Sequence, residues 1–291
     1  SVMELSHRSK AFIDVMEQAE ARLRRLLGVS DDYAVLFQQG GASQQFATVP
    51  LNLSLEADNA DYLVTGQWSK KAFAEGARFV NAHCVADGGA DNFMSLPPRD
   101  DWSISGGRYF HYCPNETIGG LEFPAVPQVD SPLVADMSST LLSRPIDVTQ
   151  FGVIYAGAQK NIGPAGLALV LVRKELLGRA RPSCPAMLNW DTAAANGSMY
   201  NTPPTFAVYL TGLVFEWLES MGGLEVMGAM NARKAARLYS QIDNSSFYSN
   251  PVDESARSWM NVPFTLADAA LDTIFLDEAE QAGLTNLKGH R

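Results

Sequence analysis

The alternation of short apolar runs with amphipathic stretches constrains the fold of this chain most. Residues 10–27 place apolar side chains at helical spacing, between Ser9 and Gly28 as candidate caps. Residues 33–37 (YAVLF) then form a short apolar run typical of a buried strand. We expect further strands at 61–66, 109–113, 132–136, 152–157 and 167–174, and further helices near Ala42 and over 69–79, 203–221 and 223–241. Strands that alternate with helices predict an α/β fold with a mainly parallel sheet.

Two segments are less regular. Residues 82–107 are rich in Gly, Asp, Pro and Ser, which predicts mostly loop and edge structure. The tail 258–291 predicts a strand over 259–264 (WMNVPF), a helix over 277–283 and a turn. A slight shift in composition near 225–230 suggests a domain boundary.

Charge and hydropathy exclude some classes of function. The 291 residues carry a formal net charge of -10, which opposes nucleic acid as the main partner. A local cluster of Arg, Lys and His could still attract a small anion. No run of about 18 apolar residues occurs, so we expect no membrane span.

The three cysteines, Cys84, Cys113 and Cys184, are far apart and odd in number. This spacing fits neither a disulfide framework nor a zinc site, and it predicts no metal and a reducing cytoplasmic location. The start of the chain shows no signal-peptide pattern.

Lys160 follows small residues in YAGAQKNIGPAG and precedes a glycine-rich turn. A lysine amine is nucleophilic only when neutral, and desolvation lowers its pKa toward that state. The position therefore suits a Schiff base with an aldehyde cofactor. A solvated lysine at a strand end is the alternative.

Asp136 ends the apolar run PLVAD, where an α/β fold places ligand-binding residues. A carboxylate there could keep a pyridinium nitrogen protonated, as a pyridoxal phosphate (PLP) ring requires. A helix cap is an equally good interpretation of this residue alone.

The stretch LFQQGGASQQ joins a strand, a glycine pair and a helix start. Free backbone amides and the helix dipole at such a junction can hold a phosphate, here near Ala42 and Ser43. Trp68 and Thr117 each follow a predicted strand. Trp68 could stack on a flat cofactor ring, and Thr117 could bind a cofactor oxygen. A tight turn, a core tryptophan and a turn threonine are the alternatives.

Two His-Arg pairs, His7-Arg8 and His290-Arg291, lie at the two ends of the chain. Arginine forks match carboxylates and phosphates, although two such pairs could equally be surface residues.

Taken together, HYCPNETIGG, SSTLLSRPIDV, YAGAQKNIGPAG, NGSMYNTPPTFAVYLTGLVFEWL and LKGHR resemble the phosphoserine aminotransferase family of class V, fold-type I PLP enzymes. The resemblance covers essentially the whole chain. It implies a large PLP-binding domain (1–227) around a mainly parallel seven-stranded sheet, and a smaller, incomplete α+β C-terminal domain (228–291).

The resemblance also assigns site residues. It makes Lys160 the catalytic residue that carries the cofactor. It assigns contacts with the cofactor to Ala42, Ser43, Trp68, Thr117, Asp136, Gln159, Lys160 and, from the neighbouring subunit of a homodimer, Asn201 and Thr202. It assigns the substrate carboxylate to Arg8 and the substrate phosphate to His7, His290 and Arg291.

The implied reaction exchanges the amino group of L-glutamate with 3-phosphohydroxypyruvate and gives O-phospho-L-serine and 2-oxoglutarate. A related reaction that forms 4-phosphohydroxythreonine would serve pyridoxine biosynthesis. The implied partners are a second copy of the chain and small anionic substrates, with no nucleic acid and no membrane.

The sequence departs from the family pattern in three places. From the resemblance we expect that the chain lacks the pieces that the family carries before SVMELSHRS and after GHR, and that turnover is affected. Some members have a basic residue where Ser43 stands, and the region ADGGADNF is shortened.

Three alternatives stay open. The chain could be another class V enzyme, such as an alanine–glyoxylate type aminotransferase or a cysteine desulfurase, although no cysteine lies in a suitable loop. It could be a PLP-binding dimeric fragment with little turnover. A nucleotide-binding α/β protein is disfavoured, because neither glycine fingerprint occurs.

Overall fold

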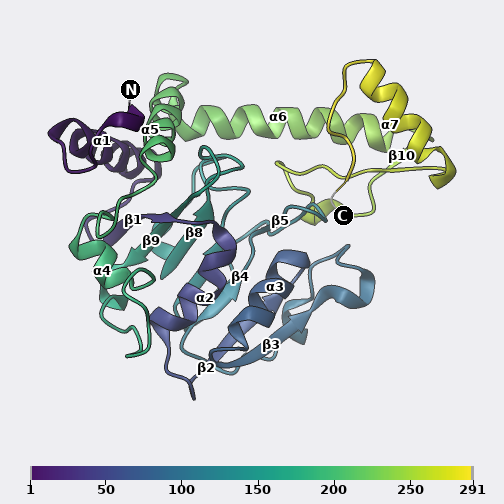
Figure 1. Ribbon diagram of the computed structural model, residues 1–291. Coiled ribbons are helices and arrows are strands. Elements are labelled where there is room, and N and C mark those ends of the chain that lie inside the picture. Colours follow the sequence, from purple (N-terminus) through teal and green to yellow (C-terminus); the bar gives the residue numbers. More distant parts are fainter. Residues whose placement is uncertain (1, 290–291) are drawn as a thin grey trace.

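A seven-stranded sheet forms the centre of the molecule, and a computed structural model describes residues 2–289 of it (Figure 1). The strands lie in the order β1-β9-β8-β7-β4-β2-β3. Their bounds are β1 Tyr33–Gln39, β2 Asn59–Val64, β3 Asn81–Asp87, β4 Phe110–Tyr112, β7 Leu133–Asp136, β8 Val153–Gly157 and β9 Leu167–Arg173.

The sheet is mainly parallel, as the alternation of strands and helices predicts. The pairs β3/β2, β2/β4, β4/β7 and β7/β8 are all parallel. Only β9 differs, because it runs antiparallel to both of its neighbours, β8 and β1. The predicted α/β fold with a mainly parallel seven-stranded sheet is therefore confirmed.

Both faces of the sheet are covered, which explains why the strands read as continuous apolar runs. In β9, Leu167, Leu169 and Leu171 pack into the core on one face. Val170 and Val172 pack into the core on the other face. The first face lies against α1 (Lys10–Leu27) and α5 (Thr205–Ser220), and the second lies against α2 (Ala42–Leu53) and α3 (Gln67–Gly76).

Helix α1 has the predicted bounds because its caps fix both ends. The hydroxyl of Ser9 accepts a hydrogen bond from the backbone amide of Phe12 at 3.3 Å. Gly28 ends the helix in the left-handed conformation, with φ 65°. The buried face of α1 comprises Phe12, Met16, Ala19, Leu23 and Leu27.

The chain after α5 extends away from the sheet. Helix α6 (Gly223–Asp243) leads to a small unit of β10 (Tyr248–Ser249), β11 (Thr265–Leu266) and α7 (Asp272–Gln281) (Figure 1). Helix α4 (Trp190–Ala195) and two short strands, β5 (Asn115–Glu116) and β6 (Leu121–Glu122), complete the larger elements. The predicted domain boundary at 227/228 falls inside α6, and the division into two domains stays a prediction.

The predicted strand over 259–264 is wrong. The Ser258 hydroxyl accepts hydrogen bonds from the backbone amides of Met260 and Asn261, both at 3.1 Å. These bonds curl the chain and hold it out of a sheet ladder. The prediction of loop and edge structure for 82–107 is confirmed, because its first residues belong to the edge strand β3 and the rest is mainly irregular.

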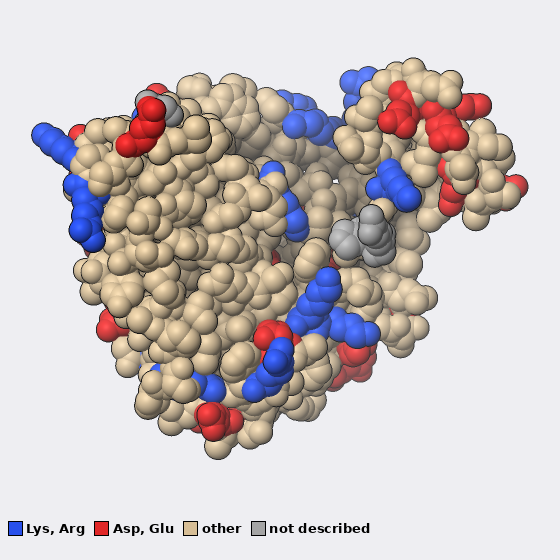
Figure 2. Space-filling view, in the orientation of Figure 1, with Lys and Arg blue, Asp and Glu red and all other residues tan. Residues whose placement is uncertain are grey.

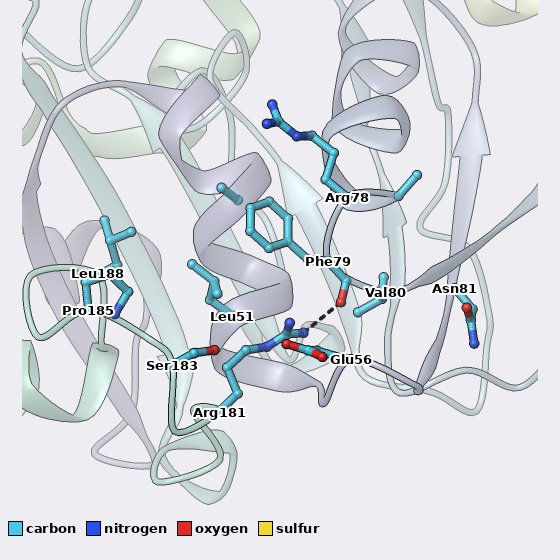
Figure 3. A pocket seen from close by; sticks show the side chains of 12 residues that line it. Leu51, Glu56, Arg78, Phe79, Val80, Asn81, Arg181, Ser183, Pro185 and Leu188 are labelled. Atoms are coloured by element: carbon cyan, nitrogen blue, oxygen red, sulfur yellow. Dashed lines mark hydrogen bonds between the residues drawn. The ribbon is translucent and has the colours of Figure 1, made fainter.

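Arg181 joins the ends of two helices that flank the sheet. Its guanidinium donates hydrogen bonds to the carbonyls of Pro50 and Ser54 at the end of α2 and of Phe79 just after α3. The Pro50 carbonyl also accepts the backbone amide of Ser54, and the Ser54 and Phe79 carbonyls lie just beyond the helix ends. A cavity of about 650 Å³ lies beside this buried side chain (Figure 3). Because its guanidinium is already bonded to backbone carbonyls, Arg181 has a structural role here, and we do not assign a reactive site to this cavity.

No helix within residues 2–289 is both long and apolar enough to cross a bilayer.

Candidate active site

A pocket of about 140 Å³ lies where the carboxyl ends of the central strands meet the starts of α2 and α3. It is lined by Gly41, Ala42, Ser43, Trp68, Cys113, Asn115, Thr117, Asp136, Ser138, Ser139, Gln159 and Lys160. Ligands of open α/β sheets bind at this edge.

Lys160 lies in the turn that follows β8, and its side chain opens into the pocket. Its Nζ donates a hydrogen bond to Thr117 Oγ1 at 2.5 Å and lies 5.4 Å from the centroid of the Trp68 ring. Partial burial lowers the pKa of the Lys160 amine, while the negative charge of Asp136 acts in the opposite direction. The amine therefore lies beside a hydroxyl and an aromatic ring, and it is easier to neutralise than a solvated lysine.

Asp136 ends β7 and is 6 % exposed. Its Oδ1 accepts hydrogen bonds from the backbone amide of Ser138 at 3.0 Å and from the Ser138 hydroxyl at 2.5 Å. Burial raises the pKa of the Asp136 carboxyl, and the bonds from Ser138 and the charge of Lys160 counteract this rise. The result is a buried carboxylate, held in one orientation and close to a lysine amine.

The start of α2 forms an anion cradle. Gly41 is the N-cap, and no side chain bonds to the first amides of the helix. Gly157, at the end of β8, lies close to this helix start. A Cβ on Gly157 would come within 3.2 Å of the Ala42 nitrogen and 2.8 Å of Gln159 Oε1. The missing side chain therefore lets the helix start, Gln159 and the β8 strand surround one small space.

Glu116 fixes the position of Trp68. Its two carboxylate oxygens accept hydrogen bonds from the backbone amides of Trp68 at 2.9 Å and of Ser69 at 2.8 Å. Glu116 is buried at the start of α3, where a negative charge is favourable. The Trp68 ring is held as one wall of the pocket by this contact.

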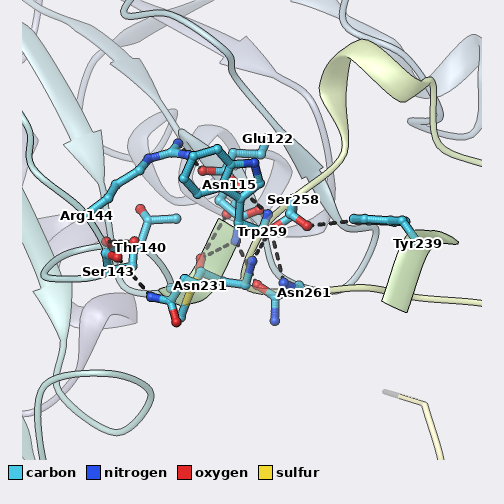
Figure 4. Close-up of polar contacts among 12 residues, drawn as sticks. Asn115, Glu122, Thr140, Ser143, Arg144, Asn231, Tyr239, Ser258, Trp259 and Asn261 are labelled. Atoms are coloured by element: carbon cyan, nitrogen blue, oxygen red, sulfur yellow. Dashed lines mark hydrogen bonds and ion pairs between the residues drawn. The ribbon is translucent and has the colours of Figure 1, made fainter. Parts of the chain in front are cut away.

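Asn115 connects the pocket to the C-terminal part of the chain. Its Nδ2 donates hydrogen bonds to Ser139 Oγ and to Asn261 Oδ1, both at 2.7 Å. Nearby, Glu122 pairs with Arg144, and its other oxygen accepts a bond from the backbone amide of Trp259 (Figure 4). The segment that carries Asn261 is thereby fastened to the sheet beside the pocket.

The surface around this region is uneven in charge. Figure 2 shows Lys and Arg side chains around a hollow in the middle of this face, and Asp and Glu side chains gathered over α7. A chain with a net charge of -10 can therefore still attract an anion locally.

The structure brings most of the predicted site residues together. Ala42, Ser43, Trp68, Thr117, Asp136, Gln159 and Lys160 all line the one pocket. Asn201 lies in a different pocket beside β1, and the Thr202 carbonyl bonds to Gln39. His7 and Arg8 lie in the turn before α1 and do not line the Lys160 pocket, and His290 and Arg291 lie outside the described residues.

Sequence reasoning missed several residues of this site, namely Cys113, Asn115, Glu116, Ser138 and Ser139. Three of them lie in the segment CPNET, beside the predicted Thr117. The sequence signal for these residues was the polar run that directly follows the short apolar strand predicted over 109–113. The pattern alone does not reveal that Glu116 turns away from the pocket to bind the start of α3.

Residues 2–289 hold no cluster of three or more His, Cys, Asp or Glu that could bind a metal ion.

Comparisons with known proteins agree with this geometry. The family model described as aminotransferase class-V matches residues 1–291. The chain belongs to the class-V aminotransferase family. Within this family, it is 59% identical to a phosphoserine aminotransferase of Hahella chejuensis over 293 residues, which cover 100% of this chain and 81% of that protein. A phosphoserine aminotransferase of Pseudomonas aeruginosa is 57% identical over the same share of both chains.

Solved structures of class-V aminotransferases superpose closely on this chain. The PLP-bound phosphoserine aminotransferase of Trichomonas vaginalis gives a TM-score of 0.96 at 43% identity, covering 100% of this chain and 84% of that one. The phosphoserine aminotransferase of Bacillus circulans subsp. alkalophilus gives 0.97 at 44% identity, covering 100% of this chain and 81% of that one.

Proposed function

We propose that this chain is a PLP-dependent phosphoserine aminotransferase. It transfers the amino group of L-glutamate to 3-phosphohydroxypyruvate and gives O-phospho-L-serine and 2-oxoglutarate. The observation that carries the proposal is the presence of Lys160 and Asp136 in one pocket, below an aromatic wall and beside an uncapped helix start. Relatives at 57–59% identity over the whole chain carry the same name.

The pocket fits PLP in three chemical respects. A phosphate suits the free amides of α2, which a side chain at Gly157 would crowd. A flat ring suits the wall made by Trp68. A basic ring nitrogen suits a buried carboxylate, and Asp136 is held at its Oδ1 by Ser138 and lies near the positive charge of Lys160.

When bound, PLP supplies an electron-withdrawing ring that accepts the charge left by loss of the substrate Cα proton. Lys160 Nζ would hold the cofactor, and its amine would be the base that takes and returns the substrate Cα proton. Thr117 Oγ1 orients Nζ through its 2.5 Å hydrogen bond.

Asp136 would keep a proton on the ring nitrogen, because a buried carboxylate pairs best with a cation. Trp68 would shield one face of the ring from water and so suppress unwanted protonation of the reacting carbon.

The substrate binds through its two anionic ends. Arg8 would take the carboxylate, and His7, His290 and Arg291 would take the phosphate. A homodimer would bring Asn201 and Thr202 of one protomer to the cofactor phosphate of its partner. Their exposed loop and their absence from the Lys160 pocket of the same chain support this arrangement. Cys84, Cys113 and Cys184, all unpaired, suit a cytoplasmic setting.

A substrate panel tests the proposed function. The PLP-saturated chain is assayed with L-glutamate, L-alanine and L-cysteine as donors, and with 3-phosphohydroxypyruvate, glyoxylate and a phosphorylated four-carbon keto acid as acceptors. We expect the highest kcat/KM for L-glutamate with a phosphorylated acceptor. A preference for alanine with glyoxylate, or sulfide release from cysteine, would overturn the assignment.

The oligomer is tested separately. Sedimentation should give a dimer, and Asn201→Ala should weaken PLP binding while leaving the dimer intact. A monomer that binds PLP as tightly as the dimer would refute the shared site.

A further inference from the structure

Behind Asp136, the sheet buries two polar side chains that the proposed chemistry does not use. Tyr155 on β8 is the register partner of Asp136 on β7. His111 on β4 lies on the other side of β7, and its Nε2 is 2.8 Å from the Tyr155 hydroxyl. Both side chains are almost completely buried, at 0 % and 1 % exposure. Polar groups this deep in a core carry a desolvation cost unless they are bonded.

The direction of the hydrogen bonds follows from counting protons. Tyr155 reaches over β7 to His111, so its hydroxyl lies on the side of Asp136, and it lowers the pKa of the Asp136 carboxyl as a facing donor does. An ionised carboxylate can only accept. Tyr155 has one hydrogen, so it donates to Asp136 and must accept from His111. His111 therefore carries its hydrogen on Nε2. Its Nδ1 has no hydrogen-bond partner among the described residues, which is compatible with an unprotonated nitrogen there.

The imidazole stays neutral in this place. Burial lowers the pKa of His111 to about 3, so the ring supplies a hydrogen bond and no charge near neutral pH. The ionisable groups that face Asp136 are Lys160, Tyr155, Glu116 and Cys113. Of these, only Lys160 can carry a positive charge, and this charge is lost whenever its amine is neutral. A neutral donor behind the carboxylate does not vary in this way.

We propose that His111 and Tyr155 are positioning residues, which form a buried relay that fixes the orientation and the ionised state of Asp136 toward the ring nitrogen of PLP. This inference rests on the proposed function, because it concerns the Asp136 carboxylate that this function pairs with the ring nitrogen of PLP. The relay acts through Asp136 and touches neither cofactor nor substrate.

Tyr155→Phe removes the relay and keeps the buried ring. Tyr62→Phe is the matched control, because Tyr62 is equally buried and its hydroxyl contacts the Tyr109 hydroxyl instead of Asp136. Both changes delete one buried hydroxyl from the same sheet, so they carry similar costs for folding. Only the first should affect the ring nitrogen.

The readout is the dissociation constant for two probes, PLP and its 1-deaza analogue, in which a CH group replaces the ring nitrogen. We expect Tyr155→Phe to weaken PLP binding about tenfold, as loss of a hydrogen bond to a charged group does. It should change binding of the 1-deaza analogue by less than about twofold, because that ring has no nitrogen for Asp136 to hold. Tyr62→Phe should leave both constants nearly unchanged.

Nitrogen-15 NMR of histidine-labelled protein without cofactor tests the relay itself. We expect a neutral His111 with its hydrogen on Nε2 from about pH 5 to pH 9, and an altered Nε2 shift in Tyr155→Phe but not in Tyr62→Phe.

Three results would overturn the inference. Tyr155→Phe could weaken binding of both probes equally, which would show a packing role alone. It could leave PLP binding unchanged, or His111 could carry its hydrogen on Nδ1. Failure of the unaltered chain to bind PLP would instead overturn the proposed function, and the relay's role toward the cofactor with it.

Discussion

The reactivity of the Lys160 amine depends on groups that shift its pKa in opposite directions. Burial favours the neutral form, and the nearby carboxyl groups of Asp136 and Glu116 favour the protonated form. A single amine with this environment and a 2.5 Å bond to Thr117 differs from a solvated surface lysine.

Lys160→Ala should therefore remove the covalent attachment of the cofactor. We expect the absorbance of the covalently bound form to disappear, and turnover to fall by at least about 10³-fold, because both the attachment and the proton transfer depend on this amine. Absorbance spectra and mass spectrometry after borohydride reduction measure the attachment. Lys174→Ala, an exposed lysine at the end of β9, serves as the control. A reduced PLP adduct in the Lys160→Ala chain would contradict the assignment.

His111 should make the folded chain sensitive to acid. Its pKa is about 3 in the folded state, below the value of about 6.5 expected when unfolded. The unfolded state therefore binds more protons between these values, and stability falls as the pH decreases through this window. Between about pH 7.5 and pH 4.5 this one residue should cost about 2 to 3 kcal/mol.

Urea unfolding at the two pH values measures this cost. His111→Gln has no titrating ring, so it should lose about 2 to 3 kcal/mol less than the unaltered chain over the same interval. Equal losses in both chains would show that His111 titrates normally in the fold.

At the scale of elements, the start of α3 depends on a close approach between Gly66 and Glu116. A Cβ at position 66 would lie 2.4 Å from the Glu116 carboxyl carbon. The φ angle of Gly66 is 171°, which any residue can adopt, so the requirement for glycine is steric. Moving Glu116 would release the amides of Trp68 and Ser69.

Gly66→Ala should therefore cost about 1 to 3 kcal/mol of stability and weaken PLP binding by displacing Trp68. Gly119→Ala is the control, since a Cβ there meets nothing within 4 Å, and it should change stability by less than about 0.5 kcal/mol. Chemical denaturation and PLP titration report the two effects. A Gly66→Ala chain with unaltered PLP affinity would show that Trp68 does not depend on this contact.

The ends of α2 and α3 share one cap. Arg181 is buried and donates to three backbone carbonyls, so Arg181→Met would remove a hydrogen bond from each of them. We expect a loss of at least about 2 kcal/mol of stability, with PLP affinity of the folded chain retained. The exposed Arg179→Met should have little effect. Denaturant unfolding compares them, and equal stability of the two variants would contradict the capping role.

At the scale of the whole molecule, the sequence predicted what depends on local pattern. Helix α1 has its predicted bounds because Ser9 and Gly28 cap it, and β9 reads as a strand because both of its faces are buried. Lys160 and Asp136 were identifiable because each lies at the carboxyl end of a strand of the mainly parallel sheet.

What the sequence did not predict depends on contacts between distant segments. Glu116 reaches the start of α3, 47 to 48 residues earlier in the chain. Asn115 meets Asn261 across 146 residues, and the Ser258 hydroxyl turns the chain where WMNVPF suggested a strand. The relay of His111 and Tyr155 likewise requires the strand order, which places β7 between their two strands.

The most direct test of the central claim is a single half-reaction in the absence of a keto acceptor. The PLP-saturated chain is mixed with L-glutamate, and 2-oxoglutarate and the absorbance of the cofactor are measured together. We predict about one 2-oxoglutarate for each cofactor site and conversion of the cofactor to its amino form, which 3-phosphohydroxypyruvate then reverses with formation of O-phospho-L-serine. A chain that binds PLP at Lys160 but releases no 2-oxoglutarate would contradict the account.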